Sequence, residues 1–350
     1  MRKRIFATLF IIIMKFLFCF ITVLFTQNTI AQNTNFSVKK LKLPAEIEYY
    51  DNQFSGLFVD GENLLLMSES RLQDNAEPKI YSLKLADIER NVSDTNFRMR
   101  FKKYPIKNLD ILRNKMAMKG DDYEGLEAIT MKDNIVYLSV ETSTPSDNCY
   151  LLRGFFKDSI LEMDLNFLLP TPKPIDAYGK HIYNAGYEAI TTIDESIFNI
   201  FEYNSFIGKN NFAVGITPVS YTNVAYQKSM VGNIPFRITD ITKTGKNSFT
   251  AINYFYKGGG DDSVYRVPTT DKENDLKTRD AKGYKSYCRL VTMEYKKGKF
   301  TWKPLWDFPT EYMSYNWEGI AAYKNGYFII NDKYTPARPY STVLLFLGRN

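Results

Sequence analysis

The stretch EAITTIDESIFNIFE, which runs from Glu188 to Glu202, decides the fold because its pattern occurs five times along the chain. The other four copies have the same length and need no gap; they run from Ser55 to Glu69, Glu127 to Glu141, Thr239 to Asn253 and Glu318 to Asp332. The second residue of every copy is small or Asp, the third is aliphatic, and the last is an acid or its amide. Such regular self-similarity is typical of propellers and solenoids.

Each copy is expected to form a β-hairpin, because two apolar runs flank a tip of turn-forming residues such as Asn325-Gly326. If the tip lies midway, the first and last residues of a copy face each other with Cβ atoms about 5 Å apart. Three pairs of acids would then lie side by side: Glu127 with Glu141, Glu188 with Glu202, and Glu318 with Asp332. Like charges so placed repel, which indicates a bound cation, a shared proton or a basic ligand.

Further strand patterns follow each hairpin and complete a four-stranded blade. They lie at 79–85 and 97–101, at 149–156 and 159–165, within 212–226, and at 287–295 and 299–306. The fifth copy has only one such strand after it, at 341–347, so the N-terminal strand at 36–43 is the expected fourth. Pairing the two terminal strands would close the ring and remove exposed sheet edges. The sequence predicts an all-β propeller of five four-stranded blades, and the longer gaps leave room for a sixth, degenerate blade.

Residues 1–31 have the features of a signal peptide: Arg2, Lys3 and Arg4, a long apolar run, and Thr29-Ile30-Ala31 as the cleavage site. We therefore expect an exported protein, periplasmic or secreted, with residues 32–350 as a single propeller domain. Translation could start at Met1 or at Met14. An uncleaved membrane anchor is the alternative, because the apolar run is long enough to span a bilayer.

Charge and cysteine usage exclude several classes of function. The formal charge is +6, and the predicted leader holds four basic residues and no acid, which leaves +2 for the mature chain. Basic residues there are scattered among acids, so we expect no nucleic-acid partner. The chain is expected to be a monomer. Cys149 and Cys288 follow hairpins two copies apart, so no disulfide is predicted between them.

The acids of the repeats are the main candidates for chemistry, because the first strand of a propeller blade lies nearest the central channel. The acids that begin three of the copies are predicted ligands for calcium or magnesium: Glu127, Glu188 and Glu318. Those that end the copies are candidates for general base work on a metal-bound water: Glu141, Glu202 and Asp332, with Glu69 in the same position. Alternatively, these carboxylates accept hydrogen bonds from the next blade and hold the ring together.

Other candidates lie in the long loops near the same mouth. His181 is the only histidine and could act as a general acid, although a lone loop histidine often has no specific role. Four basic residues could receive a phosphate or carboxylate, or could be ordinary surface charge. They are Arg71, Lys257, Lys333 and Arg338. The sequence contains no serine-nucleophile elbow, zinc-ligand spacing or dinucleotide fingerprint.

Several short motifs resemble those of a known family. In chain order they are Tyr123-Glu-Gly-Leu-Glu-Ala-Ile-Thr, Asn184-Ala-Gly-Tyr-Glu-Ala-Ile, Ile238-Thr-Asp-Ile, Asn316-Trp-Glu-Gly-Ile and Ile330-Asn-Asp-Lys. From about residue 50 to 335 they are similar to the phytase-like exported propellers of bacteria, also called "esterase-like activity of phytase". The SdiA-regulated propellers share the Glu-Gly-Ile theme. Members of the phytase-like family usually carry Glu-Arg after the second strand of the fourth unit, where this chain has Asn253-Tyr254.

The resemblance implies hydrolysis of an ester or phosphoester. The first functional hypothesis is therefore an exported, metal-assisted hydrolase of a small-molecule ester or phosphoester, with its site at the channel mouth. The second is a non-catalytic propeller that binds an unknown ligand or partner at the same mouth. Contact with a membrane is expected only through the leader, if it is not cleaved.

Overall fold

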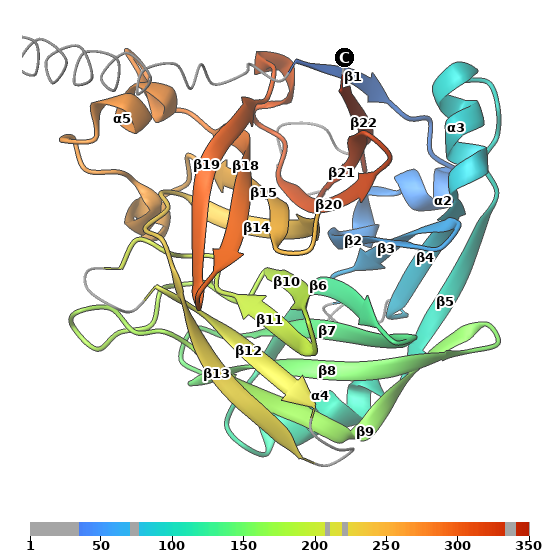
Figure 1. Ribbon diagram of the computed structural model, residues 1–350, viewed down its shortest axis with the longest axis horizontal. Coiled ribbons are helices and arrows are strands. Elements are labelled where there is room, and N and C mark those ends of the chain that lie inside the picture. Colours follow the sequence, from blue (N-terminus) through green and yellow to red (C-terminus); the bar gives the residue numbers. More distant parts are fainter. Residues whose placement is uncertain (1–34, 71–76, 207–210, 219–222, 333–340, 350) are drawn as a thin grey trace, which may run out of the picture. The chain divides into compact units, whose positions relative to one another are not determined.

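The computed structural model describes residues 35–349 apart from 71–76, 207–210, 219–222 and 333–340. The predicted leader lies outside the described residues. Within the described part of the chain, no helix is long and apolar enough to cross a membrane. Five groups of four strands account for most of the described residues, and they surround a common centre (Figure 1).

The strands follow the predicted order, four to a blade. Blade one is β2 (Phe54–Asp60), β3 (Asn63–Ser68), β4 (Lys79–Lys84) and β5 (Phe101–Lys107). Blade two is β6 (Tyr123–Lys132), β7 (Ile135–Thr142), β8 (Asn148–Lys157) and β9 (Ile160–Pro172). Blade three is β10 (Ala189–Ile193), β11 (Ser196–Ile200), β12 (Phe212–Pro218) and β13 (Val224–Val231). Blade four is β14 (Arg237–Lys243), β15 (Ser248–Phe255), β18 (Tyr287–Lys296) and β19 (Lys299–Asp307). Blade five is β20 (Trp317–Tyr323), β21 (Gly326–Asn331), β22 (Leu344–Arg349) and β1 (Phe36–Lys40).

The innermost strands close a ring. β2 contacts β6, β6 contacts β10, β10 contacts β14, β14 contacts β20, and β20 returns to β2. The N-terminal strand β1 pairs antiparallel with the C-terminal strand β22, from Phe36 opposite Arg349 to Lys40 opposite Leu345 (Figure 1). The prediction of a five-bladed all-β propeller closed by its two terminal strands is confirmed.

The long gap after the first hairpin holds helices rather than a sixth blade. Helix α3 (Leu85–Ser93) follows β4 directly, and helix α4 (Leu109–Ala117) precedes blade two. Leu85, Ile88 and Val92 recur at helical spacing and pack against the core of blade one. The strand predicted at 97–101 therefore begins only at Phe101. The remaining helical segments are α2 (Ala45–Glu48), η1 (Tyr50–Asn52), η2 (Asp261–Tyr265), α5 (Lys272–Thr278) and η3 (Thr310–Tyr312), and a two-stranded ribbon is formed by β16 (Arg279–Asp280) and β17 (Gly283–Tyr284).

The repeat pattern follows from crowding at the ring. A Cβ atom on Gly319 would lie 2.5 Å from Ile330 Cγ2 and 2.9 Å from Leu57 Cγ, so the second residue of the fifth copy has no room for a side chain. The fourth copy has Asp240 there instead, and its Oδ2 accepts a hydrogen bond of 2.7 Å from the Ile320 N–H of blade five. The conserved size of this position in the repeats is thus a packing requirement.

The fourth hairpin differs from the other four in register. In the first copy Gly56 pairs with Met67, eleven residues later. The corresponding Asp240 pairs with Ile252, twelve residues later, so the tip of this hairpin is one residue longer. The gapless match over 239–253 is therefore wrong beyond the tip, and the residue that occupies the place of the final acid is Tyr254, opposite Arg237.

Candidate functional site

The first residue of the repeat lies at a β-bulge on the innermost strand. The register shifts around Ser55, Glu127, Thr239 and Glu318, each of which is the extra residue on its strand. A bulge changes the direction in which a side chain points. The predicted pairing of first with last residue is therefore wrong by two positions: Glu141 lies opposite Gly125, and the Asp332 N–H donates to Asn316 O at 2.7 Å.

A cavity of about 310 Å³ lies where these bulges meet, and we call it the mouth cavity. Six acids of the repeats line it: Glu69, Glu127, Glu141, Glu188, Glu318 and Asp332. All six are buried. Arg237, Asp262, Tyr183 and Tyr256 complete the charged and aromatic part of its wall. Glu202 is fully buried and does not belong to the lining residues.

Glycine two residues before the bulge brings acids of neighbouring blades together. A Cβ atom on Gly125 would lie 2.7 Å from Glu69 Cγ and 3.0 Å from Glu127 Oε1. A Cβ atom on Gly186 would lie 3.2 Å from Glu141 Cγ. The acid that ends the second strand of one blade therefore leans over the first strand of the next. The contacts between acids run between blades as well as within a hairpin.

Arg237 occupies the same position in the fourth copy, where the second and third copies have glycine. Its Nε lies 3.3 Å from Glu202 Oε2, and one terminal nitrogen lies 3.2 Å from Asp262 Oδ1. The guanidinium covers the ring of Tyr265 at 4.5 Å, and the Tyr265 hydroxyl donates to Glu202 Oε1 at 2.8 Å. This arginine is absent from the sequence-based candidates because it lies two residues before Thr239, where the fourth copy of the repeat begins. A comparison of the residues two places before each copy would have revealed it.

The third hairpin stabilises its two acids by sharing a proton. Burial and then the charge of Glu202 raise the pKa of Glu188 well above its ordinary value. Burial also raises the pKa of Glu202, but Arg237, the Tyr265 hydroxyl and a hydrogen bond from Glu188 act in the opposite direction. Glu188 therefore retains its proton and donates it toward Glu202.

Two other acids of the mouth cavity hold protons more tightly than usual. Burial, followed by the charges of Glu202 and Glu124, raises the pKa of Glu141 to about 8. Burial and then the charge of Asp332 raise the pKa of Glu318 well above its ordinary value. The Asn316 amide donates to Glu318 Oε1 and, at 3.4 Å, to Asp332 Oδ2.

The donor atoms suit a hard cation. Glu141 Oε1 and Glu188 Oε2 are buried and have no hydrogen-bond partner among the described residues. Carboxylate oxygens are the ligands that calcium and magnesium prefer. Within the described ranges, however, no three acidic, histidine or cysteine side chains stand close enough to form a ready-made ligand set. An ion held here would therefore keep several water molecules, as magnesium commonly does.

Two other predicted residues that the structure describes, His181 and Lys257, do not line the mouth cavity. His181 lies on the loop before β10, and its Nε2 is 3.2 Å from Asp147 Oδ1. It is not among the lining residues. Lys257 is exposed after β15. Arg71, Lys333 and Arg338 lie outside the described residues. Cys149 and Cys288 are both free and buried.

Comparisons with known proteins assign no family to the chain. The sequence matches no protein-family model and no curated protein. Solved structures similar to the chain include a β-xylosidase (8% identity, TM-score 0.45, 89% of this chain and 94% of that one). Others are an α-L-arabinofuranosidase of Clostridium thermocellum ATCC 27405 (10%, 0.42, 80% and 81%) and an exported protein of Bacteroides fragilis NCTC 9343 (12%, 0.40, 92% and 98%). Similarities at these identities and TM-scores support no inference about the activity of this chain.

Proposed function

We propose that the chain is an exported, metal-assisted hydrolase of a small ester or phosphoester, as in the phytase-like family that it resembles, and that the mouth cavity is its site. One observation carries this proposal. Buried carboxylate oxygens of Glu141 and Glu188, without hydrogen-bond partners among the described residues, lie at a cavity large enough for a small ligand. Buried acids in such a state call for a cation or a proton donor.

Each acid has a distinct role in the proposed reaction. Glu127, Glu188 and Glu318 would hold a calcium or magnesium ion partly through its water molecules, since they do not form a ready-made ligand set; when bound, the ion would polarise an ester oxygen and lower the pKa of a bound water. Glu141 is protonated at neutral pH, because its pKa is about 8, and can donate a proton to the leaving group. Asp332 lines the cavity and is better placed as a base than Glu202, which is buried behind Arg237.

The proposal is tested by an activity screen of residues 32–350. We expect turnover of phosphomonoesters, phytate or aryl esters that depends on calcium or magnesium and stops with chelator. Glu141→Gln should lower the rate by about a hundredfold or more, as expected for loss of a general acid. Glu162→Gln, an acid of the outer strand β9 that pairs with Lys157, is the matched control and should change little. No turnover of any of these substrates with either metal would contradict the hydrolase.

A second candidate, a binding protein for an organic cation, is favoured by the charge of the cavity. Glu202 and Asp262 already neutralise Arg237, and the described lining residues include six further acids and no other basic side chain, so a basic ligand could take up a proton from them. Tyr183 and Tyr256 add aromatic rings that can contact an ammonium group. Primary amines should then raise the melting temperature, whereas their N-acetylated forms should not. An equal response to both forms would exclude this candidate.

A further inference from the structure

The residues around Arg237 form a chain of contacts that leads from the mouth cavity to α5. We propose that Asn253 and Arg289 are positioning residues that hold Arg237 at the wall of the mouth cavity. The functional consequence of holding Arg237 in place rests on the proposed function of the cavity, whereas the contacts that hold it do not. Neither residue lines the cavity.

The backbone before Arg237 is in a conformation that needs support. Phe236 has a φ of +70°, in the left-handed region that a bulky residue rarely adopts. The Asn253 amide donates to Pro235 O at 2.8 Å and to Arg237 O at 3.0 Å. It thus binds the carbonyls on both sides of Phe236 and keeps the turn closed. Because the turn sets the direction of Arg237, Asn253 acts on the guanidinium without contacting it.

Arg289 fixes the orientation of the Asn253 amide. Its Nε donates to Asn253 Oδ1 at 2.8 Å, and since a guanidinium can only donate, the amide nitrogen must face the two carbonyls. Arg289 is only 1% exposed, and no ion pair joins it to an acid of the described chain. Its guanidinium lies 5.4 Å from the centre of the Phe236 ring. A buried arginine without an acidic partner is costly, which argues for a specific task.

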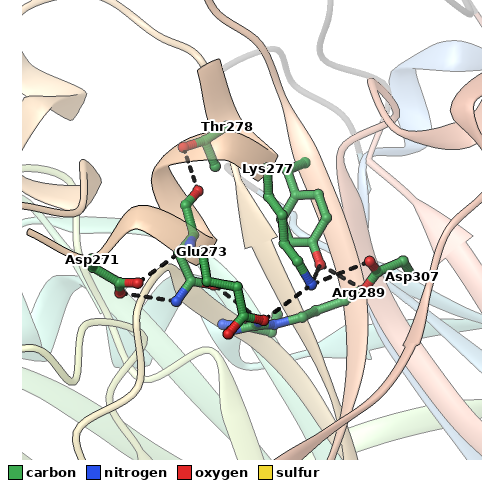
Figure 2. A network of polar contacts seen from close by, with 9 residues as sticks. Asp271, Glu273, Lys277, Thr278, Arg289 and Asp307 are labelled. Carbon is green, nitrogen blue, oxygen red and sulfur yellow. Dashed lines mark hydrogen bonds and ion pairs between the residues drawn. The ribbon is translucent and has the colours of Figure 1, made fainter. Parts of the chain in front are cut away.

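Helix α5 completes the chain of contacts. The Asn274 side chain accepts from one terminal nitrogen of Arg289 at 3.2 Å and donates to Asp271 Oδ2 at 2.9 Å. Figure 2 shows the helix held on the blade by Lys277, whose Nζ lies 3.3 Å from Asp307 Oδ2.

The insertion between β15 and β18, which carries α5, also reaches the side chain of Arg237. It includes η2, from which Asp262 pairs with Arg237 and the Tyr265 hydroxyl donates to Glu202. One insertion in blade four therefore contacts Arg237 directly through η2 and supports its backbone through α5, Arg289 and Asn253.

Chemical modification of arginine tests the inference without any metal or substrate. Phenylglyoxal reacts with accessible guanidinium groups, and mass spectrometry reads the extent at each arginine. In the native protein Arg237 should react slowly. Asn253→Ala removes two hydrogen bonds from the turn and should raise the rate of modification of Arg237 about tenfold. Arg289→Lys should also raise the rate of modification of Arg237, and it replaces Asn253→Ala in the test if that variant does not fold.

Two controls separate positioning from general loosening. Arg153 has a 4% exposed side chain, pairs with Asp164 at 2.7 Å in blade two, and should stay protected in every variant. Asn91 is also fully buried and also bridges two backbone groups, the Lys42 N–H and the Phe97 carbonyl, so Asn91→Ala is the matched substitution and should leave Arg237 slow. An unchanged rate at Arg237, or equal acceleration at Arg237 and Arg153, would overturn the inference. Absence of metal binding or turnover would count only against the proposed function.

Discussion

At the scale of single residues, Glu188 is where the electrostatics and the proposed function meet. It lines the mouth cavity, is 8% exposed, and holds a proton because ionisation beside Glu202 in a buried site is unfavourable. A divalent cation would relieve the same repulsion by displacing that proton. Proton and cation are therefore alternative solutions to one physical problem.

The first prediction concerns this acid. Calcium or magnesium should raise the melting temperature at neutral pH, because an ion that binds only the folded state stabilises it by mass action. Glu188→Gln should reduce that rise by about half or more, since the amide is a weaker ligand for a hard cation. Glu162→Gln should leave it unchanged. Identical responses of the two variants in differential scanning fluorimetry would exclude Glu188 as a ligand.

The second prediction concerns pH. The folded-state pKa of Glu141 is about 8, against 4.5 for the free side chain, so the folded chain keeps a proton that the unfolded chain loses. The free energy of unfolding should therefore decrease as the pH rises from about 4.5 to 8, by an amount on the order of a few kcal/mol. Glu141→Gln should flatten this decrease. Urea unfolding at pH 5 and pH 8 in chelator measures this decrease. An equal decrease in the original protein and in Glu141→Gln would contradict the raised pKa of Glu141.

The sequence showed which acids gather at the mouth but not how they face one another. Glu127 and Glu318 were expected opposite Glu141 and Asp332, and the bulges displace both pairings. The bulge lies at the first residue of the copy, so the hydrophobic alternation after it is unchanged and periodicity gives no sign of it. Arg237 was missed because its role depends on Glu202 and Asp262, which are distant in sequence.

At the scale of elements, the hairpins were predictable because two apolar runs and a turn tip specify them locally. The helices were less so. No helix was predicted between the strand patterns at 79–85 and 97–101, but Leu85, Ile88 and Val92 form the apolar side of α3. The extra residue in the fourth tip also escaped notice, since a gapless alignment still matched Asn253 to the final acid.

The third prediction concerns the link between two inner strands. Asp240 is buried, and it accepts hydrogen bonds from the Ile320 N–H of β20 and the Ile241 N–H of β14, each at 2.7 Å. Asp240→Ala should lower the free energy of unfolding by about 2–3 kcal/mol, because it leaves buried donors without an acceptor. Asp240→Asn keeps an acceptor and should cost less. Equal losses in urea unfolding would show that the hydrogen bonds are not the cause.

At the scale of the whole molecule, closure of the ring was predictable from a count of strands. Four blades had four strand patterns or room for them, and the fifth lacked one that the N-terminus could supply. The structure confirms this pairing between β1 and β22. What the count could not give is the joining of blades at their outer edges, where β5 pairs with β9 and β13 with β19 in parallel.

The fourth prediction tests closure. Deletion of residues 32–43 removes β1 and the buried side chains of Phe36, Leu41 and Leu43, and it exposes one edge of β22. The melting temperature should fall by several degrees or the protein should aggregate, because pairing and burial are lost together. Deletion of residues 32–34 alone, before the strand, should have little effect. An unchanged melting temperature after the longer deletion would count against closure by β1.

We propose that the mouth cavity is a cation site built from the acids of the repeats, and calorimetric titration of residues 32–350 with calcium and with magnesium is the sharpest test of this proposal. We expect saturable binding of at least one of these ions, with release of protons, because burial raises the pKa of Glu188 and Glu318 and a bound cation would displace protons from them. Binding should weaken about tenfold or more in Glu188→Gln. The cation site would be contradicted if titration produced no heat in either of two buffers with different ionisation enthalpies and if the melting temperature were the same in metal and in chelator.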